Sequence, residues 1–526
     1  MSPSHARLVA ALAAAAGLAA CNALTGADEI AIRYDKHKHG SSSGEGAGSS
    51  SSSSGSGLVG PGGSSTSSSG AGAGPEMVYA DGVRIDALAL YQGVKRPLIQ
   101  NGGPAASDVP VVANRNALLR VFYSPIDGGN GQPVTARLTL GDKQHEATGS
   151  LGSGSSDASL GSTLNVLVPA ESLPGFTSYR VELLQPSGVA SGNNQLAAYP
   201  AQGKQDVAVQ SSGQQLKIVL VPIAYNADGS GRLPATGESQ LKLYHDEFYG
   251  IYPTPAVVLT VHQAVGWDQA IQPNGAGWGE LLDAMVSFRQ SDGAKPDEYY
   301  YGIFSPAPSM AAFCGGGCVA GLSMMAGPND AFARVGIGLG FPGESSAESA
   351  AHETGHMHGL GHAPCGGPQG VDPNYPYAGG KLGSFGYDLV DGKLYSPSTT
   401  YDLMTYCQPV WISDYHFVKL FQRIKLVNGA LVQWPADAFD RTYERIRIGM
   451  DGTAHWEAPI ALHTPPLGAG GATPVSAETD AGPVEVPGHF FPFTHIAGGL
   501  LLFAQPGAAP SAVSFELAGQ QHELAR

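Results

Sequence analysis

The sequence of 526 residues is poor in basic side chains, with 28 Lys and Arg against 44 Asp and Glu and a net charge of −16. Binding to DNA or RNA depends on a basic face that neutralises phosphates. We therefore expect no nucleic-acid partner. A membrane-spanning helix needs about 20 apolar residues. The apolar run at 8–20 is shorter than that, so we do not read it as a membrane span.

Cysteine is also scarce, and one of the five, Cys21, ends the segment Leu18-Ala19-Ala20-Cys21. Together with Arg7 and the apolar run before it, this pattern resembles a bacterial lipoprotein signal, residues 1–21, cleaved before a cysteine that becomes lipidated. An ordinary secretory signal is the alternative, and both export the protein. Asn22 stands where some bacteria place an aspartate for inner-membrane retention. We expect an outer-membrane or cell-surface lipoprotein, held to the membrane by its lipid alone, or a form released outside the cell.

Residues 22–76 are predicted to be a disordered tether. From Ser41 to Pro75 the chain is almost wholly Ser and Gly, a composition that cannot bury enough apolar surface to fold. As a random coil, such a segment spans roughly 30–35 Å. An anchored protein could therefore sample the nearby surface.

The segment 352–362 fits the pattern H-E-x-x-H-x-x-G-x-x-H. On a helix, His352 and His356 project from one face, where two neutral imidazoles can share one Zn²⁺. Gly359 lets the chain turn sharply, which brings His362 back as a third ligand. Three protein ligands leave a position for water, the arrangement of a catalytic zinc site. Glu353, beside the ion, is then placed to act as general base.

The helix that carries this motif is predicted to run over about 346–358. Ser345 and Glu348 have the spacing of a capping box, and Gly359 ends the helix. His358 lies about 200° around the helix from His352 and His356, so we expect it to point away from the metal. A strand is predicted just before the helix, over 333–341.

A second motif, Tyr401-Asp402-Leu403-Met404-Thr405-Tyr406-Cys407, follows about forty residues later. It resembles the Met-turn of the metzincin zinc endopeptidases. The resemblance implies that Met404 forms an apolar floor under the three histidines. It also implies that Tyr406 reaches the metal or the transition-state oxyanion, as a tyrosine at this position does in two branches of that clan. An ordinary core tyrosine is the alternative for Tyr406.

The resemblance covers about residues 215–428 and departs from the better-known branches at 363–367, directly after the third histidine. The segments 372–377 and 408–415 look like those of bacterial exported metzincins, including the mucin-degrading group. Asp402 and Asp388 are candidates for carboxylates that orient the zinc ligands. The piece 319–326 is expected to be the edge strand above the cleft, which in the resembled clan binds extended substrate.

Four cysteines remain after Cys21, and three pairings are possible. We favour Cys314–Cys318, which closes a small loop through three glycines. We also favour Cys365–Cys407, because each lies three residues past a motif residue that a metzincin fold would bring together. A second metal site made of these cysteines is disfavoured, since their spacing lacks paired C-x-x-C knuckles.

The predicted fold class is α+β: a zincin-like domain at 213–428 with a mixed twisted sheet and an active-site helix, flanked by all-β domains. Strand-length runs between Gly, Pro and Asn turns predict a β-sandwich over 77–212. Similar short runs predict a small β domain over 429–526. We expect the β-sandwich to act as a passive spacer, and binding of carbohydrate or protein is the alternative.

Taken together, these residues predict a zinc-dependent endopeptidase with one catalytic Zn²⁺ and a protein or glycoprotein substrate. A protease specific for mucin-type glycoproteins is an alternative within the same chemistry. A surface adhesin that keeps zinc only for structure is the alternative from another class. A structural site, however, has no need of Glu353 or of an open ligand position.

Overall fold

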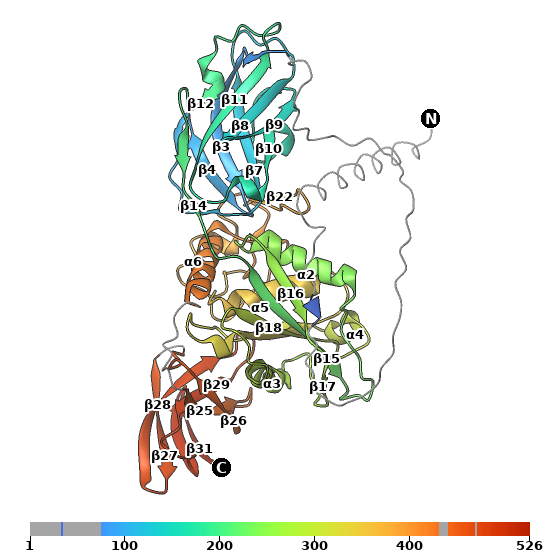
Figure 1. Ribbon diagram of the computed structural model, residues 1–526. Helices are drawn as coiled ribbons and strands as arrows, with labels where there is room; N and C mark the ends of the chain where they lie inside the picture. The colour runs from blue at the N-terminus through green and yellow to red at the C-terminus, as the bar shows by residue number, and fades with distance from the viewer. Residues whose placement is uncertain (1–32, 35–74, 431–439, 469–470) are drawn as a thin grey trace, which may run out of the picture.

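The computed structural model describes residues 33–34, 75–430, 440–468 and 471–526. The predicted signal segment, Cys21 and nearly all of the predicted tether lie outside the described residues. Three bodies follow one another along the molecule: an N-terminal β-sandwich, a central domain of mixed structure and a C-terminal β domain (Figure 1). Among the described residues, no helix combines the length and the hydropathy that crossing a membrane requires.

The N-terminal domain packs two antiparallel sheets face to face. Alternate residues of β8 are buried, which is the pattern of a strand with one face in the core. One sheet has the order β10-β7-β3-β4-β5: β3 Val83–Tyr91, β4 Lys95–Gln100, β5 Gly103–Pro104, β7 Ala117–Pro125, β10 Leu164–Val168. The other has the order β12-β11-β8-β9, with β2 and β13 also paired to β11: β2 Met77–Tyr79, β8 Val134–Leu140, β9 Lys143–Gly149, β11 Thr177–Pro186, β12 Ala198–Tyr199, β13 Gln205–Val207.

The central domain is built on a twisted, mostly parallel sheet with the order β1-β16-β15-β18-β20-β19. Its inner strands β15, β18 and β20 are almost wholly buried, as expected for a parallel sheet covered on both faces. β19 is antiparallel to β20 and forms one edge. The bounds are β1 Arg33–Tyr34, β15 Leu216–Tyr225, β16 Val257–Val261, β17 Val265–Trp267 (beside the end of β15), β18 Glu298–Phe304, β19 Gly321–Ser323 and β20 Val335–Leu339.

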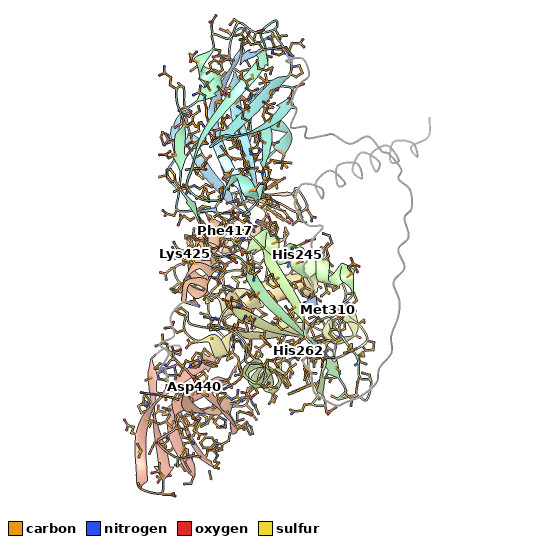
Figure 2. The ribbon with its side chains drawn as sticks, viewed as in Figure 1. His245, His262, Met310, Phe417, Lys425 and Asp440 are labelled. Atoms are coloured by element: carbon orange, nitrogen blue, oxygen red, sulfur yellow. A yellow bond between two sulfur atoms is a disulfide. The ribbon has the colours of Figure 1, made fainter. Side chains whose placement is uncertain are left out.

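Helices cover both faces of this sheet. α2 (Glu238–Ile251), α5 (Glu344–Met357) and α6 (Asp414–Ala430) share one apolar core with one face. α3 (Trp278–Ser291) packs on the opposite face. Phe417 of α6 lies where the central domain meets the sandwich (Figure 2), and the same core takes in Tyr91 and Val94 of the sandwich. The sandwich and the central domain are therefore joined by a continuous core.

The C-terminal domain is an antiparallel sheet with the order β26-β25-β29-β28-β27-β30-β31. One face packs against α3, because Tyr443, Phe491 and Leu502 belong to the core that contains Trp278 and Met285. The bounds are β25 Arg441–Ile448, β26 Ala454–Leu462, β27 Ala472–Thr479, β28 Gly482–Pro492, β29 Gly499–Ala504, β30 Ala512–Leu517 and β31 Gln520–Ala525.

Two sequence-based expectations are wrong in detail. Residues 33–34, inside the predicted tether, form β1 and pair in parallel with β16, since the edge of that strand offers free backbone groups. The motif helix begins at Glu344 rather than near 346, and its N-cap is Gly343 with no side-chain cap hydrogen bond. The predicted capping box of Ser345 and Glu348 does not form, because both residues already lie within the helix.

Candidate metal centre

The motif segment folds as its spacing predicts. His352 and His356 lie on α5, and Gly359, with a φ of 81°, turns the chain out of the helix. His362 follows in a short bridge to Val371. Gly355 is required between the two helical histidines, because a Cβ there would lie 2.6 Å from Met404 Sδ. The sequence thus brings three imidazoles together, with Met404 packed against the helix that carries two of them.

Each of the three imidazoles is held by a backbone carbonyl. His352 Nδ1 lies 2.8 Å from Leu403 O, and His356 Nδ1 lies 2.8 Å from Leu360 O. His362 Nδ1 contacts Gln369 O in the same way. A carbonyl oxygen only accepts, so each Nδ1 must carry the proton. Each Nε2 is left with a free lone pair.

These Nε2 atoms point at one another. His356 Nε2 and His362 Nε2 are 3.1 Å apart, although both are lone-pair acceptors. His352 Nε2 is buried and has no hydrogen-bond partner among the described residues. Two nitrogen lone pairs that face each other without a proton between them repel. A cation bound between them would replace this repulsion with attraction. Neutral imidazole nitrogens are preferred zinc ligands, so these residues fit a Zn²⁺ ion.

The protonation states agree with this interpretation. Burial lowers the pKa of His352, and burial with repulsion from the neighbouring imidazoles lowers the pKa of His356 well below its usual value. The same causes lower the pKa of His362 to about 3. All three rings are therefore neutral at physiological pH, as metal binding requires.

Glu353 is buried beside the imidazoles. Its Oε2 accepts a hydrogen bond from Ser323 Oγ at 2.5 Å, and its Oε1 lies 2.8 Å from His495 Nε2. Burial alone would raise the pKa of Glu353, but His495, His352 and Ser323 outweigh burial and lower it. The carboxylate is therefore ionised at neutral pH and can accept a proton.

The segment 401–407 packs against α5, where Met404 Sδ approaches Gly355 and Leu403 O holds His352. Met404 is fully buried, its N–H donates to Asp402 Oδ1 at 2.8 Å, and its carbonyl accepts from Ala363 N at 2.9 Å. Cys365 and Cys407 form a disulfide with a Cα–Cα distance of 5.7 Å. The disulfide and the backbone bond tie the third-ligand loop to the Met404 turn.

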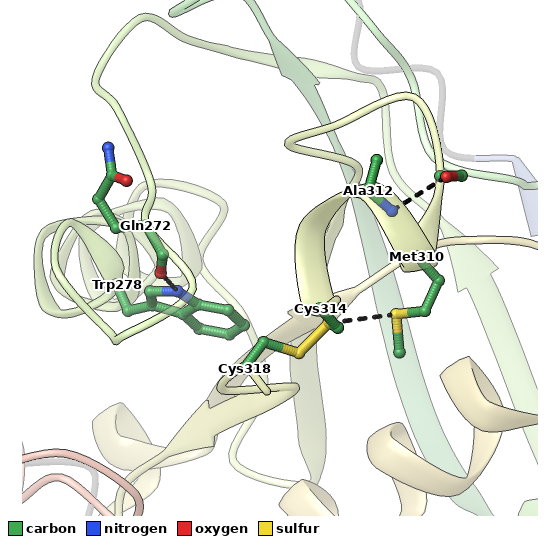
Figure 3. The surroundings of a disulfide bond; sticks show 7 residues. Gln272, Trp278, Met310, Ala312, Cys314 and Cys318 are labelled. Atoms are coloured by element: carbon green, nitrogen blue, oxygen red, sulfur yellow. Dashed lines mark hydrogen bonds between the residues drawn. A yellow bond between two sulfur atoms is a disulfide. The ribbon is translucent and has the colours of Figure 1, made fainter. Parts of the chain in front are cut away.

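The other cysteine pair shapes the wall of the cleft. Cys314 at the end of α4 (Met310–Cys314) is bonded to Cys318, as favoured from the sequence (Figure 3). The cleft beside the imidazoles has a volume of about 700 Å³. Its lining runs from this loop along the edge strand to α5 and the Met404 turn, and includes Met310, Cys318, Ala320, Gly321, Ser349 and Tyr406.

Tyr406 lies at the mouth of this cleft and is not a core tyrosine, because 48% of it is exposed. Its ring centre is 5.2 Å from that of His362, and its hydroxyl lies 2.5 Å from His495 Nδ1. Burial of the hydroxyl end raises the pKa of Tyr406, so the phenol is neutral. The neutral hydroxyl is an available hydrogen-bond donor beside the imidazoles.

His495 is a site residue that the sequence analysis missed. It lies between β28 and β29 of the C-terminal domain, yet its ring belongs to the same cluster as His352, His356 and His362. One ligand atom from each of the four lies within 4.8 Å of the others. These imidazoles can bind one metal ion. No local pattern marks this lone histidine, since only the packing of the third domain brings it to the motif.

The prediction that Asp402 and Asp388 orient the zinc ligands is wrong, because backbone carbonyls hold the three histidine rings instead. Asp402 accepts from His416 Nδ1 at 2.7 Å and from Ser413 N at 3.0 Å, and so fixes the start of α6. Asp388 accepts from Val390 N at 2.7 Å within its own turn. Both carboxylates shape the loops that support the site.

His358 lies away from the cluster, as its helical position predicts. Its ring stacks on Tyr299 with centres 4.3 Å apart, and its Nδ1 lies 2.8 Å from Thr354 O. Burial lowers the pKa of His358 to about 3, so the ring is neutral. His358 packs α5 against the sheet.

No family model matches this chain, and no curated protein matches it. Among solved structures, metalloproteinase-II from Bacteroides fragilis is similar over 61% of this chain and 86% of that chain. The sequence identity is 14% and the TM-score is 0.23. At this identity and TM-score the similarity carries no argument about function. The chemistry of the site is therefore argued from the residues of this chain.

Proposed function

We propose that this chain is a zinc-dependent endopeptidase that hydrolyses peptide bonds of extracellular or surface proteins. The observation that carries the proposal is the convergence of three free Nε2 lone pairs, from His352, His356 and His362, beside the ionised Glu353. A cleft of about 700 Å³ reaches this point. The donor set and the adjacent base are those of a metal-assisted hydrolase.

A bound Zn²⁺ supplies Lewis-acid chemistry, polarising a carbonyl and making water a stronger acid. Glu353 takes the proton from the attacking water and delivers it to the leaving amine. Ser323 Oγ, 2.5 Å from Glu353 Oε2, holds the carboxylate in place. Tyr406 is placed to donate its hydroxyl to the carbonyl oxygen as negative charge develops there.

The edge of the sheet offers a template for an extended substrate. β19 pairs with β20 through Leu322, so the antiparallel ladder turns the backbone groups of Gly321 and Ser323 outward. Gly321 lines the cleft directly beside Glu353. A peptide added to this edge would place its carbonyl groups next to the base, which is recognition by β-augmentation.

The direct test substitutes the base. Glu353→Gln should keep stoichiometric zinc and reduce peptidase activity by several orders of magnitude, because the amide cannot accept the proton. Glu344→Gln, an exposed change in the first turn of the same helix, is the matched control and should be unaffected. Casein, intact mucin and deglycosylated mucin serve as substrates, with zinc measured in the same samples. Full activity of Glu353→Gln would contradict the proposal.

A second candidate function is that of a non-enzymatic surface protein with structural zinc. The observation that favours it is His495, because a fourth protein ligand closes a zinc site. Zinc-loaded protein that cleaves none of the three substrates, whether His495 is present or removed, would support this candidate over the peptidase.

We further propose that the protein is exported and held at the outer membrane or cell surface by lipid on Cys21. Support comes from the signal-like segment 1–21 and from the Cys314–Cys318 and Cys365–Cys407 disulfides, which suit an oxidising compartment. Metabolic labelling with a fatty acid should mark the wild type and not Cys21→Ala. Equal labelling of both proteins would contradict the lipid assignment.

A further inference from the structure

The turn between β28 and β29, residues 493–498, reaches out of the C-terminal domain into the cleft of the central domain. Thr494 N donates to Ser323 O at 3.1 Å, and Ser323 N donates to Thr494 Oγ1 at 3.1 Å. Met324 and Phe493 form an antiparallel bridge. The turn therefore occupies the outward backbone groups of Ser323, which an added strand would use.

The His495 ring completes a tetrahedron with the three motif imidazoles. The separations between ring centres for all six pairs lie between 4.5 and 5.4 Å. Four imidazoles bound through Nε2 to one Zn²⁺ would have ring centres roughly 5.2 Å apart. Six near-equal separations of this length are expected when four imidazoles surround one ion.

The two ring nitrogens of His495 face different neighbours, Tyr406 and Glu353. Its Nδ1 lies 2.5 Å from the Tyr406 hydroxyl, which can either donate to this nitrogen or accept from it. Its Nε2 is buried and, within the described part of the chain, has no hydrogen bond of good geometry, although Glu353 Oε1 is 2.8 Å away. A metal ion held by the motif imidazoles would take the lone pair of His495 Nε2, and the Nδ1 proton would then be donated to the Tyr406 hydroxyl oxygen.

We propose that His495 is the fourth ligand of the metal, and that the turn 493–498 is a built-in plug of the cleft. The claim that the closed site is a resting form of an enzyme rests on the proposed peptidase function. The claim that four imidazoles bind the metal does not depend on that function. In this form the chain supplies the backbone pairing and the ligand that a peptide substrate and the reacting water would otherwise supply.

The anchoring of the plug indicates how it opens. Phe493 and Ile496 are buried in the core shared with α3, and they pack closely against Gly279 and Gly275. These apolar contacts hold the base of the turn. The tip is held by the Thr494–Ser323 bonds and the His495 contacts, both of which an incoming peptide strand can replace. Gly321, still open to the cleft, gives such a strand a first point of attachment.

X-ray absorption at the zinc edge of the full-length, zinc-loaded protein tests the ligand directly. The wild type should show four imidazole ligands, and His495→Ala should show three imidazoles and one oxygen. His489→Ala, a histidine on β28 of the same hairpin, is the matched control and should match the wild type. Three imidazoles and an oxygen in the wild type, or no change in His495→Ala, would overturn the proposal.

Zinc release and activity form the second readout. Transfer of zinc to a chelator should be at least roughly tenfold faster in His495→Ala, since one ligand is lost. Thr494→Pro removes the N–H donated to Ser323 O while keeping the imidazole, and should also speed release. Peptidase activity should rise in both variants. Unchanged release and activity in both would count against the plug. If zinc release is faster in the variants but neither they nor the wild type have peptidase activity, the proposed peptidase function would be refuted. The four-ligand metal site would still hold.

Discussion

At the scale of single residues, the orientation of the imidazoles determines what the site can do. Backbone carbonyls fix the Nδ1 proton of His352 and His356, so both rings present the same nitrogen to the cluster. Glu353 is held at the same depth by Ser323. A preorganised set of neutral donors with an ionised neighbour needs no rearrangement to accept a cation.

His358 provides a contrast within the motif. His358→Ala should keep zinc near one ion per chain, because this ring faces Tyr299 and not the cluster. The same change should lower the free energy of unfolding by about 3 kcal/mol, since it empties a buried ring site. His356→Ala should lose zinc. Metal analysis and chemical denaturation check both outcomes, and loss of zinc from His358→Ala would contradict the assigned geometry.

For single residues, prediction from the sequence succeeded where the helical repeat or a local turn alone sets the geometry. The four-residue spacing of His352 and His356 and the turn at Gly359 were sufficient to place the three imidazoles. The predicted roles of Asp402 and Asp388 were wrong, because any nearby carbonyl can orient an imidazole and the sequence does not show which one is nearest. His495 was missed for a related reason, since its contact depends on how a whole domain packs.

At the scale of elements, the site depends on how α5, β19 and α6 hold the loops around it. α5 begins at Glu344 with Gly343 as its N-cap and no side-chain cap hydrogen bond, so packing of its buried face, and not a capping serine, sets its start. Ser413 caps α6, because its Oγ accepts a hydrogen bond from His416 N at 3.2 Å. Helix positions were thus predictable from periodicity, whereas their first residues were less so.

The loop after His362 is tied to α6 by an ion pair with a defined pH dependence. Asp372 lies 2.7 Å from Lys419 Nζ and 2.8 Å from Tyr415 Oη, and its own N–H donates to His362 O at 2.8 Å. Burial alone would raise the pKa of Asp372, but hydrogen bonds from Lys419, the backbone and Tyr415 lower it to about 2.

Because this pKa is lower in the folded state, the ionised carboxylate stabilises the fold above the unfolded pKa of about 3.9. The stabilisation is lost as the pH falls towards about 2. Asp372→Asn should therefore unfold more easily than the wild type at pH 7, and the difference should shrink between roughly pH 4 and pH 2. Thermal unfolding across this range checks the sign. A difference that grows on acidification would contradict the assigned pair.

At the scale of the whole molecule, apolar cores join the central domain to the sandwich on one side and to the C-terminal domain on the other. Arg115 of the sandwich is fully buried and donates to Thr254 O at 2.7 Å and to Gln92 O at 3.2 Å. It also contacts Tyr249 O, and its guanidinium lies 4.5 Å from the Tyr249 ring centre. A buried charge that is satisfied across a boundary fixes the docking of the sandwich on the central domain.

Removing this guanidinium should loosen the docking. Arg115→Ala leaves buried carbonyl groups unpaired, and we expect it to lower the free energy of unfolding by about 3 kcal/mol. Limited proteolysis should then cut the segment between the sandwich and β15. Arg137→Ala, on a partly exposed ion pair of the same domain, should cost less than about 0.5 kcal/mol. Equal stability of the two variants would contradict the docking role.

The order of the domains was accessible from the sequence, but their contacts were not. Strand-length runs between turn residues predicted β domains on both sides of the motif, because alternation and turns are local signals. The packing of Phe493 and Ile496 against glycines of the central domain left no such signal. That packing delivers His495, so the most consequential feature of the site arises at the largest scale.

The most direct measurement is an anomalous difference map at the zinc absorption edge from crystals of the zinc-loaded chain. One peak should lie about 2.0–2.1 Å from the Nε2 atoms of His352, His356 and His362, with Glu353 beside it. A peak elsewhere in the molecule, or none at the three imidazoles in protein that analysis shows to contain zinc, would contradict the account.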